Sequence, residues 1–128
     1  MIQPVAFSLL GLLVLPLSVQ AAEFSSEQLC KAAISLDMGR PVSIMTTERT
    51  GSEPQISYMR DDGDYFLYKC RIRGNRVAWA AYFSETNSWG RWRDGEWDPV
   101  LTFKEEGGRL LLHSSETGVT KEYNLHDF

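Results

Sequence analysis

The chain has 128 residues, of which 43% are hydrophobic and 23% are charged, and its formal net charge is −4. General nucleic-acid binding is disfavoured, because it depends on a basic surface that neutralises phosphates. The two histidines, His113 and His126, do not lie at the spacing of a metal-binding motif, so we expect neither a metal nor another cofactor.

The first 21 residues have the pattern of an export signal. Their apolar run, residues 5–17, is shorter than the roughly 20 residues that a membrane-spanning helix needs. Val19 and Ala21 place small residues at the −3 and −1 positions of a cleavage site after Ala21. We therefore expect a signal peptide over residues 1–21 rather than a stable membrane anchor. Residues 22–128 are expected to form a single domain, located in the periplasm or secreted.

A helix is predicted to begin at residues 24–29. Ser25 is a good N-cap, and Gln28, three residues later, completes a capping box. Gly39 can end the helix. Apolar residues at helical spacing give it one buried face: Leu29, Ala33 and Leu36. Cys30 lies beside that face.

Residues 65–83 predict a β-hairpin closed by the turn Gly74-Asn75. A glycine at the first turn position suits a type II′ turn. This turn places Arg73 opposite Arg76 and, in the expected core, Cys70 opposite Trp79. The same register pairs Ile72 with Val77, Tyr68 with Ala81, and Phe66 with Phe83. Side chains alternate along a strand, so the opposite face carries Lys69, Arg71, Arg73 and Arg76.

Cys30 and Cys70 are the two cysteines of the chain. In an exported protein an even pair favours a disulfide, and two free thiols are the alternative. The bond would join the buried face of the helix to the inner face of the hairpin. If the crosslink acts by restricting the unfolded chain, closing a loop of this length stabilises the folded state by about 4 kcal/mol.

Short apolar segments separated by turn residues predict further strands. They cover residues 42–47, 55–60, 100–104, 109–115 and 119–125, and residues 89–99 are irregular or form a short bent strand. Regularly spaced short strands are typical of an antiparallel meander. We expect an α+β fold in which the N-terminal helix packs on a curled meander, or partly closed β-barrel, of about six to seven strands.

Basic residues are concentrated in the middle of the mature chain. Residues 69–93 contain six basic residues and one acid, whereas residues 94–128 contain eight acids and three bases. Tryptophans alternate with arginines in the same region, and aromatic rings beside guanidinium groups make strong contact sites. The expected protein-binding surface consists of Arg71, Arg73, Arg76, Trp89, Arg91, Arg93 and Trp97. The alternative is that the tryptophans fill the core and that acids on neighbouring strands neutralise the arginines.

Catalytic patterns are weak. Asp94 and Asp98 are a carboxylate pair of the kind that glycoside hydrolysis needs, but solvated loop acids are more common. His113 lies on a predicted strand, where a structural role is favoured. Residues 61–64, Asp-Asp-Gly-Asp, favour a plain turn over a calcium site, because they lack EF-hand spacing.

Five segments resemble a group of small exported proteins of Gram-negative bacteria. They are CKAAI (30–34), MGRP (38–41), YKC (68–70), GNRVAWA (74–80) and GRWR (90–93). The group has no settled activity, so the resemblance implies compartment and fold more than function. Exported β proteins of similar build include periplasmic lysozyme inhibitors and immunity proteins against secreted toxins.

We therefore expect an exported, non-catalytic binding protein, such as an inhibitor or immunity factor that acts on a cell-envelope enzyme. Its expected partner is another envelope or secreted protein. Two alternatives remain open. The first is an envelope module that binds peptidoglycan or another cell-wall glycan, and the second is a small hydrolase.

Overall fold

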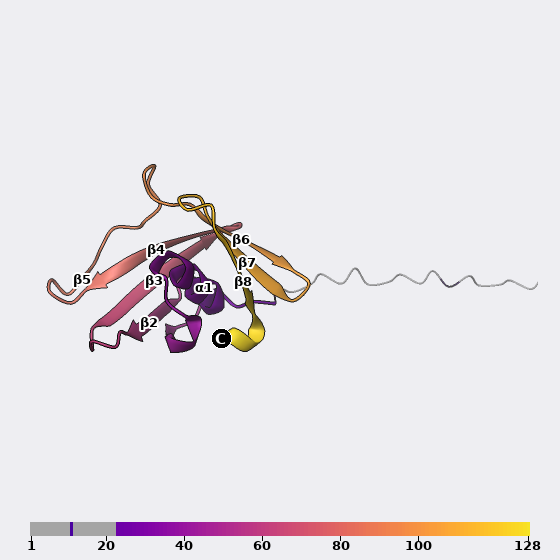
Figure 1. The fold of residues 1–128 in the computed structure, drawn as a ribbon. Helices are drawn as coiled ribbons and strands as arrows, with labels where there is room; N and C mark the ends of the chain where they lie inside the picture. Colours follow the sequence, from indigo (N-terminus) through magenta and orange to yellow (C-terminus); the bar gives the residue numbers. More distant parts are fainter. Residues whose placement is uncertain (1–10, 12–22) are drawn as a thin grey trace, which may run out of the picture.

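The computed structural model describes Gly11 and residues 23–128. The signal peptide expected over residues 1–21 therefore lies outside the described residues, apart from Gly11. In the described part, one α-helix lies in the hollow of a curled antiparallel sheet (Figure 1). None of the helices in that part is both long and apolar enough to cross a membrane.

The sheet has the strand order β1-β2-β3-β4-β6-β7-β8, and the short β5 pairs with β4. The helix is α1 (Ser26–Met38), and the 3-10 turns are η1 (Val42–Ile44) and η2 (Leu125–Asp127). The strands are β1 (Thr46–Arg49), β2 (Gln55–Met59), β3 (Tyr65–Arg73), β4 (Arg76–Phe83), β5 (Ser88–Trp89), β6 (Leu101–Glu106), β7 (Arg109–Ser114) and β8 (Thr120–Asn124). The expected α+β class is confirmed: one helix packs on a meander that curls into a half-barrel.

Helix α1 begins and ends at the residues that the sequence predicts. The Ser25 side chain accepts a hydrogen bond from the Gln28 backbone N–H, and the Gln28 side chain accepts one from the Ser25 N–H. Gly39 ends the helix in the left-handed conformation, with a φ of 65°. This conformation is readily available to glycine because it lacks a Cβ.

The β3–β4 hairpin has the expected register. Arg73 lies opposite Arg76 and Cys70 lies opposite Trp79, and the ladder continues as far as Tyr68 and Ala81. Gly74 has a φ of 59°, as the first position of a type II′ turn requires. The expected pair Phe66–Phe83 is not part of this ladder; Phe83 pairs with Ser88 of β5, and Phe66 pairs with Tyr58 of β2.

One segment differs from its prediction. Residues 42–47 were expected to form a strand, but Val42–Ile44 form the 3-10 turn η1, and β1 runs from Thr46 to Arg49. The turn lets Val42 and Met45 join the core while the chain passes from the helix to the sheet edge. Burial of these two side chains therefore prevails over the β propensity of the segment.

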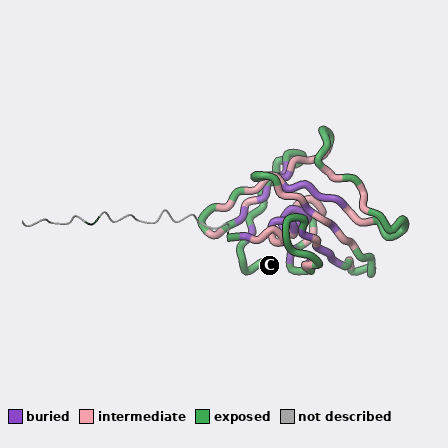
Figure 2. The backbone as a smooth tube through the Cα atoms, turned by 180° about the vertical axis from the view of Figure 1, so that it is seen from behind, coloured by how far each residue is buried: buried purple, intermediate pink, exposed green. Residues whose placement is uncertain are grey.

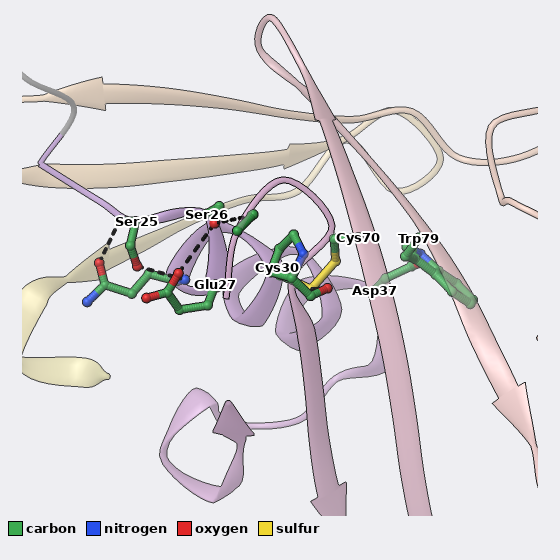
Figure 3. The surroundings of a disulfide bond; sticks show 10 residues. Ser25, Ser26, Glu27, Cys30, Asp37, Cys70 and Trp79 are labelled. Carbon is green, nitrogen blue, oxygen red and sulfur yellow. Dashed lines mark hydrogen bonds between the residues drawn. A yellow bond between two sulfur atoms is a disulfide. The ribbon is translucent and has the colours of Figure 1, made fainter. Parts of the chain in front are cut away.

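The core lies between α1 and the inner face of the sheet, where the helix packs against β2, β3, β4 and β7. Figure 2 shows the buried segments gathered inside the curl, and the exposed ones lie in the loops and along the edge strands β1 and β8. Cys30 and Cys70 are fully buried and form a disulfide with a Cα–Cα distance of 5.6 Å (Figure 3). The expected disulfide is therefore confirmed. Such bonds persist in oxidising compartments, so this one is compatible with an exported protein.

Candidate binding surface

Two cations and two tryptophans interleave on the outer face of the β3–β4 hairpin. The Lys69 ammonium lies 4.7 Å from the ring centroid of Trp89 and 5.0 Å from that of Trp92. The Arg71 guanidinium lies 4.1 Å from the Trp92 centroid. Each such contact contributes about 0.5–1 kcal/mol at exposed sites. These contacts restrict the positions of all four side chains, which we call the cation–aromatic row.

Backbone hydrogen bonds to β4 place the two tryptophans there. The Gly90 N–H donates to the Ala81 carbonyl at 2.7 Å, and the Arg93 N–H donates to the Trp79 carbonyl at 2.7 Å. The chain after β5 therefore follows β4 in an extended path. Ala80 lies opposite Lys69 on the outer face and is nonetheless fully buried. This part of the outer face is thus covered by other side chains rather than by solvent.

Three arginines and one aspartate line a pocket of about 210 Å³ at the turn end of the same face. The lining side chains come from Arg71, Arg73, Arg76, Ala78 and Asp94. The Arg76 guanidinium donates to the main-chain carbonyl of Asp94 at 3.3 Å. The pocket, which we call the arginine pocket, therefore joins the hairpin to the loop that follows β5.

That loop, residues 91–98, is held by one carboxylate. Asp98 accepts two hydrogen bonds from the Arg91 guanidinium, at 2.7 and 2.8 Å, and one from the Gly95 N–H at 2.8 Å. The Arg91 contact and then the Gly95 N–H hold the pKa of Asp98 at about 2, below its usual 3.8. The Asp98 side chain is only 8% exposed. The carboxylate therefore stays ionised and closes the loop.

The loop presents Trp97 to solvent. Its side chain is 93% exposed, and Figure 1 shows the connection between β5 and β6 projecting beyond the sheet. A tryptophan on an ordered, projecting loop is unusual, because large apolar side chains normally contribute to a core or to an interface.

Arg93 lies apart from the other arginines. Its guanidinium is 5.5 Å from the Trp79 ring centroid, and it lines a second pocket, of about 240 Å³, beyond the end of the β3–β4 ladder. Trp79 itself is buried and donates through Nε1 to Asp37 at 2.8 Å (Figure 3). Six aromatic residues line this pocket, which we call the aromatic pocket: Tyr65, Phe66, Tyr68, Trp79, Tyr82 and Phe83.

The structure thus distributes the expected surface residues over four places. Arg71, Arg73 and Arg76 line the arginine pocket, Arg91 and Trp97 belong to the loop, and Trp89 joins the cation–aromatic row. Arg93 belongs to the aromatic pocket.

Sequence reasoning left Lys69, Trp92 and Asp94 out of the expected contact set. Alternation separates the Trp92 ring from Arg91 and Arg93, but it does not say which face of the sheet the ring joins. No sequence pattern reveals that Asp94 approaches Arg76, because that contact depends on how the loop folds back.

The side chains that the sequence offers for catalysis or metal binding form ion pairs or hydrogen bonds with neighbouring residues. Asp98 is bound to Arg91, and since a general acid must be protonated at its working pH, this carboxylate is unsuited to that role. His113 is exposed and hydrogen-bonds Thr120 through Nδ1 at 2.9 Å. In the turn at residues 61–64, Asp62 and Asp64 bind Arg60. Within residues 23–128, no three His, Cys, Asp or Glu side chains are grouped to hold a metal ion.

Comparison of the chain with protein-family models, with curated proteins and with solved structures gave no match.

Proposed function

We propose that this protein is an exported, non-catalytic binding protein that contacts another envelope or secreted protein through Trp97 and the outer face of the β3–β4 hairpin. The observation that carries the proposal is the 93% exposure of Trp97 on a loop that Asp98 holds in shape. An inhibitor or immunity factor for a cell-envelope enzyme is the role that best combines such a surface with the export pattern.

Trp97 has the properties of an interface hot spot. A tryptophan buries about 150–250 Å² in a contact, and truncating a hot-spot tryptophan typically costs about 2 kcal/mol or more of binding free energy. Because the loop is already ordered, little conformational entropy is lost when a partner covers the ring. Arg91 supports this role indirectly, since its guanidinium is engaged by Asp98.

The charge of the neighbouring face favours an acidic partner. Arg73 is exposed, and Arg71 and Arg76 are half-buried on the same face. Positive surface attracts acidic proteins and speeds their association, more strongly at low salt. We therefore expect binding that depends on both the Trp97 ring and the ionic strength.

The proposal is tested by affinity capture from a periplasmic extract with the mature protein as bait. Trp97→Ala should reduce recovery of the partner at least tenfold, and raising the salt should reduce recovery by the wild type. Leu125→Ala is the matched control, because Leu125 is also an exposed apolar residue, 46% exposed, and lies in η2. Equal recovery of the same proteins by all three baits would contradict the proposal.

A second candidate function is glycan binding, and the aromatic pocket favours it. Aromatic rings there lie beside the charged side chains of Arg93 and Glu85, and stacking with nearby polar groups suits sugar rings. Co-sedimentation with purified peptidoglycan tests this candidate. Phe83→Ala should abolish co-sedimentation if the pocket holds the glycan, whereas Trp97→Ala should not.

A further inference from the structure

We propose that the arginine pocket binds a doubly charged oxyanion: a phosphate group or a pair of carboxylates. The pocket lies between Arg71, Arg73, Arg76 and Asp94, and Ala78 completes its lining. This inference goes beyond the proposed function, because the site is built by the chain itself and needs no protein partner.

The register of the hairpin brings the three guanidinium groups together. Arg71 and Arg73 are two residues apart on β3 and so share a face, and Arg76 lies directly opposite Arg73 on β4. The two-residue turn fixes this register. Between the cations, the position opposite Arg71 is Ala78, whose small side chain leaves room for the pocket.

The pocket has an excess of positive charge. Within the described residues, no carboxylate lies within 4.0 Å of the Arg73 or Arg76 guanidinium, and Arg71 reaches Glu53 at 3.8 Å. By contrast, Arg60 and Arg91 contact aspartates at 2.7 Å. Three cations and the single carboxylate of Asp94 leave the lining with a formal charge of +2. Like charges opposite each other destabilise a strand pair, and a bound dianion would remove that repulsion.

Two of the three arginines are held in place before any ligand arrives. The Trp92 ring stacks against Arg71 at 4.1 Å, and the Asp94 carbonyl accepts from Arg76 at 3.3 Å. Arg73 is exposed and can adjust to the ligand. Guanidinium groups bind carboxylate and phosphate oxygens through paired N–H donors, so this arrangement suits an oxyanion rather than a halide.

The size of the pocket limits the ligand. Its volume of about 210 Å³ is below the roughly 300–1,000 Å³ of sites for drug-sized molecules. It therefore suits a small anion or the charged end group of a larger molecule.

Isothermal titration of the mature protein with sodium phosphate and, separately, with sodium glutarate, at constant ionic strength, tests the proposal. We expect saturable binding of at least one probe, weakened at least tenfold in Arg73→Gln/Arg76→Gln. The control Arg109→Gln/Lys121→Gln removes the same charge from exposed positions on β7 and β8 and should bind like the wild type. The probe that saturates identifies the oxyanion class.

Backbone amide shifts of the wild-type protein give a second readout that needs no variant. During the titration, the amides of residues 73–76 should move in a saturable manner, and the amide of Leu125 should not. Two results would overturn the proposal: no saturable binding of either probe, or binding that is unchanged in Arg73→Gln/Arg76→Gln. Loss of partner capture by Trp97→Ala is independent of both results, so the two proposals fail separately.

Discussion

The two faces of the β3–β4 hairpin differ in what they contact. On the inner face, Cys70 and Val77 are buried against the core, and Cys70 is bonded to α1. On the outer face, Arg71 and Lys69 contact tryptophan rings from residues 89–92, and Arg73 extends into solvent. Strand alternation alone separates these two sets. The same strands thus supply the stability of the fold on one side and a contact surface on the other, so substitutions on the two faces should have different consequences.

The largest expected effect is on the inner face. Replacing both cysteines, Cys30→Ser/Cys70→Ser, should lower the free energy of unfolding by about 4 kcal/mol, because the crosslink closes a long loop in the unfolded chain. Denaturant unfolding of the oxidised wild type and of the double variant measures this difference. A loss below about 1 kcal/mol, well under the expected crosslink effect, would show that helix packing alone holds the two layers together.

The second-largest loss of stability is expected for Trp79, which lies on the inner face and bonds to the helix. Trp79→Phe keeps an aromatic ring but removes the 2.8 Å hydrogen bond to Asp37, so the free energy of unfolding should fall by about 2 kcal/mol, as for other hydrogen bonds to charged groups. Binding of the partner through Trp97 should not change. A variant as stable as the wild type would mean that this bond adds nothing to the attachment of the helix.

A smaller effect on stability is expected on the outer face. Trp92→Ala removes the ring that contacts Lys69 and Arg71, and two cation–aromatic contacts amount to about 1–2 kcal/mol. The distinctive result is functional: Arg71 should lose its fixed position, and binding of phosphate or glutarate in the arginine pocket should weaken. Unfolding experiments and the titration together measure both effects, and unchanged anion binding would contradict the role of Trp92.

The smallest expected effect is a local loss of order in the loop of residues 91–98 when Asp98 is protonated at acid pH. The pKa of Asp98 is about 2 in the folded protein and 3.8 ordinarily. Because the pKa of Asp98 is lower in the folded protein, the stabilisation that its carboxylate gives to the loop is fully present above pH 3.8. It is lost as the pH falls toward 2. Exchange of the Gly95 amide, which donates to Asp98, should therefore stay slow down to about pH 4 after correction for intrinsic rates. Loss of protection with a midpoint at pH 3.8 or above would contradict the Arg91–Asp98 contact.

The helix, the hairpin and the disulfide between them can be predicted from the sequence, because short local motifs specify them. The capping box at Ser25 and the turn at Gly74 each fix a nearby register, and the pairing of the hairpin then directs Cys70 toward the helix. The outward direction of Arg71 and Arg73 follows from the same alternation.

The details of the surface depend on contacts between distant parts of the chain. Whether Trp92 packs inside or outside is decided by the path of residues 90–93 along β4, and no local pattern fixes that path. The position of the Arg91 guanidinium depends on its contact with Asp98, seven residues away in an irregular loop. The turn η1 was missed for a related reason, since tertiary burial of Val42 outweighs local propensity.

The proposed contact site for a protein partner is the loop that carries Trp97. Glu96, which is exposed beside Trp97, can be replaced by a photoreactive phenylalanine analogue in the protein expressed in cells, with the same replacement at Leu125 as control. Irradiation of cells should give a discrete crosslinked product from position 96 and none from position 125, and Trp97→Ala should abolish that product. Absence of a product from position 96, or the same product from both positions, would contradict the claim.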